Sequence, residues 1–273
     1  MKFHITLFIS IFPLLIFAKN YRFTYEYKFK PQKEKMDSVI TDYMNLDTDG
    51  KKSLFFNDSK HKMDSVYATS KNLNELTQYK NYNQNVSYTI FKDYSIPTID
   101  FYSKKFNLDI LIEEKELPKW NLIDEFSVIN TFKCQKAYTK YKGREWYAWF
   151  TKDIPINDGP YKFIGLPGLI IRVSDKEESH TFDLVQVIHI KDPFLEVPKK
   201  VRLMTQTQFD ELAKKNINLK TDVAFTNVTN KTVTVGLNDG NMMNLSNNTS
   251  NVDQAIIDKL RKSNNPIELK PSE

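Results

Sequence analysis

The sequence has 273 residues, of which 40% are hydrophobic and 13% aromatic, and its formal net charge is +5. This composition excludes a disordered chain, and the mixing of lysines with acidic residues argues against a nucleic-acid-binding arm. Cys134 is the single cysteine, which excludes an intramolecular disulfide, so the fold must rely on its hydrophobic core.

The first eighteen residues have the pattern of a secretory signal peptide. Lys2 precedes an apolar run over residues 5–17, and Ala18 is a small residue suited to a cleavage site. The run is shorter than the roughly 20 apolar residues that a membrane span needs, which favours cleavage over an uncleaved anchor. We therefore expect an exported protein without a transmembrane span, with residues 1–18 removed and residues 19–273 forming a single domain.

Alternating apolar and polar residues predict many short strands. Residues 21–30 show this period-two pattern most clearly, with Tyr and Phe on one face and polar residues on the other. Asp49-Gly50 is suited to a hairpin turn between the next two strands. The further strands are expected at residues 38–47, 52–57, 86–91, 98–103, 106–113, 120–130, 132–141, 144–151, 169–173, 180–190, 223–227 and 231–237.

Three segments have apolar residues at helical spacing: residues 59–71, a segment that begins at the capping box of Thr205 and Gln208, and residues 251–260. Residues 238–251 are rich in Asn and Ser and predict a flexible surface loop. Together these elements predict an α+β, mainly antiparallel β fold, in which a curved sheet carries two or three packing helices.

Four of the seven glycines lie between residues 143 and 168. Residues 166–169 fit a type II turn, because Pro167 presets φ at the second position and Gly168 accepts a positive φ at the third. Gly165 is expected to let the backbone approach another segment closely. Two interpretations remain open: a loop whose amides bind an anion or a peptide carboxylate, and a structural turn that leads into a buried strand.

Arg144 is followed by aromatic residues and suggests a second candidate site. Arg144, Trp146, Trp149, Asp153 and Tyr161 are candidates for binding a ligand or partner, since arginine beside aromatic rings can recognise a carboxylate or a ring. Alternatively, the tryptophans fill the core and Arg144 pairs with a structural carboxylate such as Asp153.

The sequence shows no motif for a metal, a nucleotide or another cofactor, and none is predicted. It also shows no contiguous catalytic motif. An enzyme with dispersed residues remains an alternative, in which the fold would bring together Asp153, Asp158, His180 and Cys134.

The string Gly165-Leu166-Pro167-Gly168-Leu169-Ile170 is the signature motif of the GLPGLI family of exported Bacteroidetes proteins, which this chain resembles. The similarity extends to residues 132–137, 143–151, 154–155, 159–163 and 265–269. The family has no established activity. The resemblance implies a protein of the periplasm or outer envelope, with an envelope protein or an outer-membrane transport system as partner and no nucleic acid.

We therefore expect a non-enzymatic accessory protein that binds a ligand or partner. Two alternatives remain: an envelope hydrolase with dispersed catalytic residues, and a structural or assembly component of the envelope.

Overall fold

A computed structural model describes residues 20–33, 37–59, 61–62, 85–105, 108–218, 223–229, 232–237, 242–246 and 265–269. The first nine strands are β1 (Tyr21–Phe29), β2 (Ile40–Thr48), β3 (Lys52–Asn57), β4 (Thr89–Asp93), β5 (Ile99–Lys105), β6 (Leu108–Glu114), β7 (Asn121–Ile129), β8 (Phe132–Tyr141) and β9 (Arg144–Thr151). They are followed by β10 (Leu169–Asp175), β11 (His180–His189), β12 (Arg202–Leu203), helix α3 (Gln206–Asn218), β13 (Val223–Thr229), β14 (Thr232–Leu237) and β15 (Met242–Ser246).

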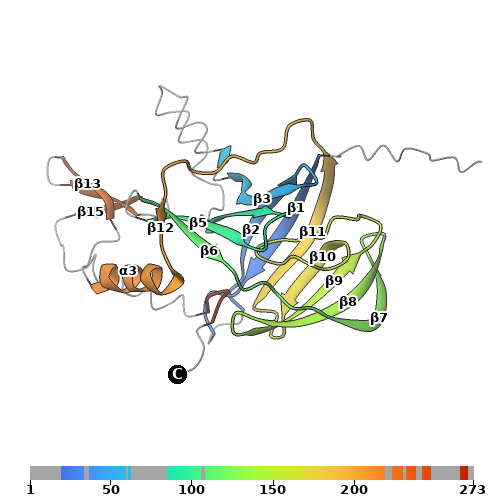
Figure 1. Cartoon of the computed structure of the whole chain (residues 1–273). Helices are drawn as coiled ribbons and strands as arrows, with labels where there is room; N and C mark the ends of the chain where they lie inside the picture. Colours follow the sequence, from blue (N-terminus) through green and yellow to red (C-terminus); the bar gives the residue numbers. More distant parts are fainter. Residues whose placement is uncertain are drawn as a thin grey trace, which may run out of the picture.

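Twelve of these strands form one open, curved sheet in the order β12-β6-β5-β4-β3-β2-β1-β11-β10-β9-β8-β7 (Figure 1). Neighbouring strands are antiparallel except β12, which pairs in parallel with β6. The remaining strands form a three-stranded sheet in the order β13-β14-β15. The mainly antiparallel β fold predicted from the sequence is thus confirmed.

The helix count and one loop differ from the prediction. The described residues contain one helix of several turns, α3, rather than two or three; residues 63–71 and 251–260 lie outside the described residues. Part of the predicted loop at 238–251 is strand β15, which pairs with β14. The loop was predicted from the many Asn and Ser residues of the whole segment. Three of the five residues of β15 are apolar, and this short apolar run suits a strand.

Local sequence signals account for the elements that were predicted correctly. In the β2–β3 turn, Gly50 adopts a φ of +83° and the Asp49 carboxylate accepts hydrogen bonds from the amides of Lys51 and Lys52. At the start of α3, Thr205 and Gln208 form the expected capping box, with reciprocal bonds of 3.0 and 3.2 Å. Phe209 of α3 packs against the small apolar cluster of β6.

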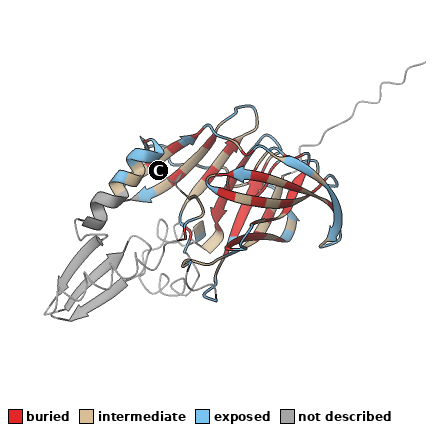
Figure 2. Ribbon diagram, turned by 90° about the horizontal axis from the view of Figure 1, so that it is seen from below, coloured by how far each residue is buried: buried red, intermediate tan, exposed pale blue. Residues whose placement is uncertain are grey.

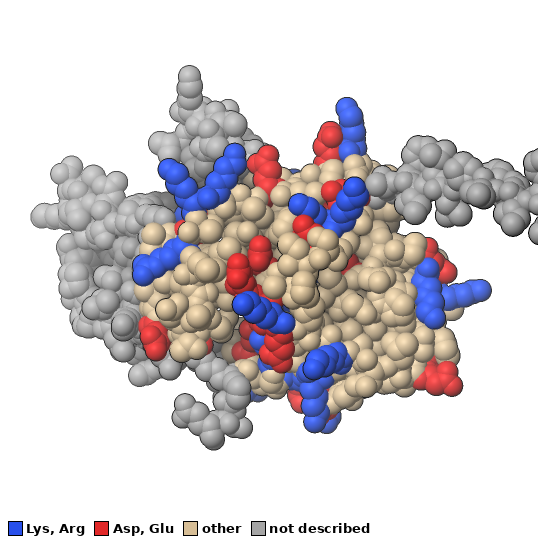
Figure 3. Space-filling model, in the orientation of Figure 1, with Lys and Arg blue, Asp and Glu red and all other residues tan. Residues whose placement is uncertain are grey.

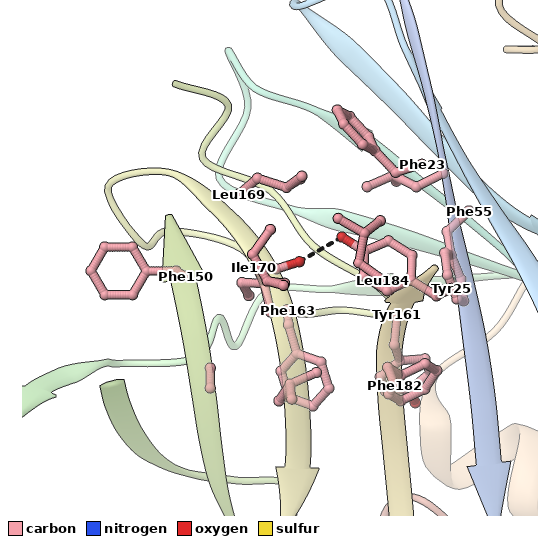
Figure 4. Packing of buried hydrophobic residues seen from close by; sticks show 14 of the residues in the cluster. Phe23, Tyr25, Phe55, Phe150, Tyr161, Phe163, Leu169, Ile170, Phe182 and Leu184 are labelled. Atoms are coloured by element: carbon pink, nitrogen blue, oxygen red, sulfur yellow. Dashed lines mark hydrogen bonds between the residues drawn. The ribbon is translucent and has the colours of Figure 1, made fainter. Parts of the chain in front are cut away.

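The main core lies between the large sheet and the loop of residues 152–168, which connects β9 to β10. Tyr25 of β1 is fully buried and donates a hydrogen bond of 2.7 Å to the carbonyl of Ile170 (Figure 4). Phe163 of the loop packs edge-on against Trp146, with ring centroids 4.7 Å apart. Buried residues gather in the middle of the large sheet, and exposed residues follow its edges and turns (Figure 2).

Among the described residues, no helix combines the length and apolar character needed to cross a membrane.

Candidate functional site

The turn at residues 166–168 is tighter than predicted; it ends the loop of residues 152–168, hereafter the glycine-rich loop. The Gly168 amide donates a 2.8 Å hydrogen bond to the Leu166 carbonyl, which closes a three-residue γ-turn around Pro167. The next amide, that of Leu169, bonds instead to Ile154. The type II turn was therefore wrong, although the requirement for Pro167 and Gly168 remains, because the proline ring presets the φ of the central residue.

The close approach predicted for Gly165 occurs at Gly168. A Cβ on Gly168 would lie 1.9 Å from the carbonyl oxygen of Thr151, and the φ of Gly168 is +147°. Gly165 is exposed, and a Cβ there would face open space. Its φ of +97° is therefore the only reason for glycine at this position. The two glycines thus serve different purposes. Gly168 lets the turn pack against β9, whereas Gly165 only allows the chain to bend.

Arg144 is buried and holds a segment of its own chain. Its Nη1 donates to Asp175 at 2.7 Å in an ion pair whose two side chains are almost fully buried. Its remaining donors reach the side chain of Asn265 and the carbonyls of Pro266 and Ile267, at 2.6, 2.6 and 3.1 Å. The structural carboxylate expected to pair with Arg144 is therefore Asp175 and not Asp153, because Asp175 of β10 pairs in register beside β9.

The segment bound by Arg144 is residues 265–269, hereafter the C-terminal segment. Tyr161 and Lys162 bind its Glu268 carboxylate at 2.5 and 2.6 Å. The Leu269 amide donates to the carbonyl of Lys142 at 3.0 Å. The groups that hold this segment form a tail cradle, defined as the side chains of Arg144, Tyr161, Lys162 and His180 with the backbone carbonyls of Lys30, Pro31 and Lys142.

The backbone of Tyr161 helps to shape this cradle. Tyr161 adopts a φ of +52°, which is uncommon for a bulky residue and occurs where the surrounding structure enforces it. Its buried ring packs 5.5 Å from Tyr88. Burial raises the pKa of Tyr161 well above its usual value, so the hydroxyl stays protonated and donates to Glu268.

His180 completes the cradle from β11. Its Nε2 lies 3.1 Å from the carbonyl oxygen of Asn265, and its Nδ1 lies 2.7 Å from the hydroxyl of Tyr27. Burial and the neighbouring Arg144 lower the pKa of His180 from 6.5 to about 3. The ring is therefore neutral at pH 7, and since a carbonyl can only accept, Nε2 carries the proton and Nδ1 accepts from Tyr27.

The other predicted site residues are not part of the cradle, although the ring of Trp146 lies 6.5 Å from that of His180. Trp146 is fully buried and donates to the Tyr141 carbonyl. Trp149 lies on the opposite face of β9, where the ammonium of Lys136 is 5.3 Å from its ring centre. Asp153 is exposed at the start of the glycine-rich loop. Of the five predicted residues, the structure brings Arg144 and Tyr161 together on the C-terminal segment.

A buried ion pair fixes the middle of the same loop. Asp158 accepts from Lys92 of β4 at 2.5 Å and from Ser53 of β3 at 2.5 Å, and all three residues are fully buried. Tyr94 adds a third bond to the same carboxylate. Burial lowers the pKa of Lys92, while the Asp158 carboxylate acts in the opposite direction.

The four residues of the dispersed-enzyme hypothesis do not form one cluster, although Asp153 lies close enough to Cys134 to help raise the pKa of its thiol. Asp158 bonds to β3 and β4, whereas His180 bonds to Tyr27 and the C-terminal segment. Cys134 is buried on β8, and burial raises the pKa of its thiol, which disfavours a thiolate nucleophile. Among the described residues, no group of three or more His, Cys, Asp or Glu side chains is arranged to hold a metal ion.

A groove of about 720 Å³ lies beside strands β3, β4 and β5, and no sequence pattern predicted it. We call it the β3–β5 groove. Its lining combines aromatic, hydroxyl and charged residues: Phe56, Asn57, His61, Ser87, Tyr88, Thr89, Tyr102, Ser103, Lys104, Asp109, Phe194, Glu196, Val197 and Pro198. None of the residues predicted as binding candidates lines it, because it is assembled from segments far apart in the chain.

Tyr88 links the groove to the interior. It lines the groove, and in the described part of the chain its buried hydroxyl has no hydrogen-bond partner. Burial raises the pKa of this hydroxyl, so it remains an O–H donor. A buried donor without an acceptor is costly.

The surface charge does not single out an anionic or cationic ligand. On the face shown in Figure 3, Lys and Arg alternate with Asp and Glu, and wide areas between them carry neither. This face offers no single-sign patch of the kind that binds nucleic acid.

Comparison with known proteins gives a short family match and a likeness of fold. A family model described as "Protein of unknown function (Porph_ging)" matches residues 135–172, which run from β8 through the glycine-rich loop into β10. No curated protein matches the sequence.

Two solved structures of PNGF-II are similar to this chain. The P21 form has a TM-score of 0.51 at 14% identity, over 79% of this chain and 36% of the other. The C2 form has a TM-score of 0.52 at 15% identity, over 72% of this chain and 33% of the other. The chain thus spans about a third of the length of these structures, and the likeness shows the fold alone.

Proposed function

We propose that this chain is a non-enzymatic binding protein that holds a small molecule in the β3–β5 groove. The groove carries the proposal, because its size and its mixture of aromatic and polar lining residues are typical of ligand sites. The matched family model describes no function, so the chemistry of the groove is the main guide.

The mixed lining suggests a small molecule with both a ring or apolar part and polar groups. Phe56 and Phe194 supply aromatic surface on one side. Lys104 lies with Asp109 and Glu196 among the lining residues, so a ligand with a single strong charge has no clear advantage over a neutral or zwitterionic one. An amphiphilic neutral or zwitterionic molecule therefore fits best.

The engagement of the candidate catalytic groups supports binding over hydrolysis. Asp158 and His180 each hold structural partners in the interior, and the Cys134 thiol is buried. We keep the envelope hydrolase as the alternative, and hydrolysis of a bound molecule by the purified protein would support it instead.

We further propose that the chain is an exported GLPGLI-type protein of the periplasm or outer envelope. The signal-like residues 1–18 support export, and the GLPGLI motif at residues 165–170 lies within the region that the family model matches. Cell fractionation of the full chain, compared with a chain lacking residues 2–18, tests this proposal. Recovery of the full chain in the cytosol would contradict it.

The groove proposal is tested with the full chain purified from its own envelope fraction. Native mass spectrometry should detect a bound small molecule, and Ser87→Trp should remove it by filling the groove. Ser127→Trp, at an exposed serine on β7, is the matched control and should retain the molecule. A wild-type protein that carries no molecule, and whose melting temperature does not respond to an envelope extract, would overturn the proposal.

A further inference from the structure

The C-terminal segment is held at every one of its residues by groups distant in sequence. Asn265 alone makes four interactions: its amide bonds to Pro31, its side chain bonds to Lys30 and Arg144, and its carbonyl accepts from His180. Contacts of this density on a segment without regular structure resemble a bound peptide more than a connecting loop.

The cradle distinguishes side chains as well as backbone. The Asn265 amide group bonds through both its oxygen and its nitrogen, at 2.6 and 2.8 Å. The Glu268 carboxylate bonds to Lys162, whose ammonium is fully buried and also lies 5.0 Å from the ring centre of Phe101. Buried polar groups discriminate strongly, because a wrong side chain leaves them without a partner.

The backbone of the segment is accommodated closely as well. A Cβ on Gly143 would lie 2.7 Å from the Leu269 carbonyl oxygen, so the β8–β9 turn leaves just enough room for the chain. Arg144 donates hydrogen bonds to the carbonyls of Pro266 and Ile267, whose side chains are apolar. The recognised pattern is therefore Asn-Pro-x-Glu-x, where the third residue is apolar because Ile267 packs against the main core, and the last residue is limited by space.

We propose that the tail cradle is a peptide-recognition site for Asn-Pro-x-Glu-x segments, and that it accepts this segment from a second copy of the chain as well as from its own. A second copy carries the matching sequence by definition. The segment lies outside the strand ladders of both sheets, so exchanging it breaks no strand pairing. Exchange of an identical element between copies is a low-cost route to a dimer. This proposal is independent of the β3–β5 groove.

The first test weakens the segment and leaves the cradle intact. The full chain with Asn265→Ala and Glu268→Gln is titrated with a fluorescent peptide of sequence Asn-Pro-Ile-Glu-Leu, and anisotropy is measured. The peptide should bind this variant at least tenfold more tightly than the wild type, whose own segment competes. Peptides with Ala for Asn or Gln for Glu are the matched controls and should bind at least tenfold more weakly.

The second test asks whether a second copy can supply the segment. Labelled wild-type chain is mixed with an excess of the Asn265→Ala, Glu268→Gln variant, and the mixture is analysed by size-exclusion chromatography with light scattering. A mixed dimer that the free peptide disperses is expected. Equal binding of all peptides, or a mixture that stays monomeric, would overturn the proposal.

Hydrogen exchange on the wild-type chain covers the case in which the variant fails to fold. The amides of Asn265 and Leu269 donate to Pro31 and Lys142 and should be protected from exchange. Excess Asn-Pro-Ile-Glu-Leu peptide should accelerate their exchange at least threefold, while the Gln-containing peptide should not. Protection that is unaffected by the peptide would show that the segment is fixed in place and would overturn the proposal.

Discussion

Gly168 and Gly165 differ in their surroundings, although both have positive φ. A Cβ on Gly168 would collide with the backbone of Thr151, whereas a Cβ on Gly165 would meet open space. Gly168→Ala should lower the free energy of unfolding by about 3 kcal/mol or more, from overpacking together with backbone strain. Chemical denaturation measures this loss.

Gly165→Ala is the matched control, since it adds the same methyl group at a positive φ but causes no steric overlap. It should cost about 1–2 kcal/mol. Equal losses for the two substitutions would contradict the close approach of Gly168 to β9.

His180 should make stability depend on pH. Its pKa falls from 6.5 to about 3 on folding, so between these values the unfolded chain binds the proton more readily. The free energy of unfolding contributed by His180 is therefore fully present above pH 6.5 and is lost progressively as the pH falls towards 3. Thermal or urea unfolding across this range measures the loss.

Neighbouring groups also titrate near His180. Burial raises the pKa of Asp175, the ion-pair partner of Arg144, and this opposes the effect of His180 as the pH falls. The comparison should therefore be made with His180→Gln, which keeps both neighbours and preserves one donor and one acceptor. Identical pH profiles for the two proteins between pH 3 and 6.5 would contradict a buried neutral His180.

At the scale of elements, the glycine-rich loop is fixed to the sheet by the ion pair of Asp158 with Lys92. Asp158→Asn should lower the free energy of unfolding by about 3–5 kcal/mol, because it leaves a buried ammonium without its counter-charge. Replacing both partners, as Lys92→Met with Asp158→Leu, should recover part of this loss. Guanidinium denaturation of the three proteins provides the measurement.

The pair of Lys136 with Glu125 on neighbouring strands is a matched exposed control. Its N–O distance is 2.8 Å, but half of the Glu125 side chain is exposed. Glu125→Gln should cost less than about 1 kcal/mol. A loss at Asp158 no larger than that at Glu125 would contradict the importance of the buried pair.

Most elements could be predicted from the sequence because their signals are local. Aromatic alternation identified β1, and the Thr205–Gln208 spacing identified the start of α3. The γ-turn could not be distinguished from a type II turn, because both place Pro and Gly at the same positions. The partner of Arg144 depended on which strand lies beside β9, and a single sequence does not show that.

At the scale of the whole molecule, the large sheet is open and ends at β7. Leu122, Phe126 and Val128 of this edge strand are 52, 65 and 69% exposed. An exposed apolar edge strand favours pairing with another chain. We therefore expect concentration-dependent association through β7, which sedimentation analysis can detect.

Phe126→Lys should reduce this association without changing the fold, since charged residues on edge strands oppose pairing. Val39→Lys is a control at an exposed apolar residue outside β7, and it should leave association unchanged. Association that persists in Phe126→Lys would place the contact elsewhere.

The β3–β5 groove is formed by segments that are far apart in the chain, so no local sequence pattern could predict it. Its lining runs from Phe56 to Pro198 and exists only once β3, β4 and β5 pair and residues 194–198 lie alongside them. Sequence patterns indicated Arg144 and Tyr161 as binding candidates, and residues 265–269 resemble the family's tail, but no pattern linked the two. That one binds the other follows from the fold.

The position of the C-terminal segment has a consequence for the order of folding. Proteins emerge from the ribosome amino terminus first, and their domains begin to fold during synthesis. Residues 265–269 therefore become available after every strand of the large sheet, including β9 and β11 that contribute Arg144 and His180 to the cradle. Until residues 265–268 are available, the donors of Arg144 and Lys162 that they satisfy must be hydrated, so the cradle is completed only after the strands that build it.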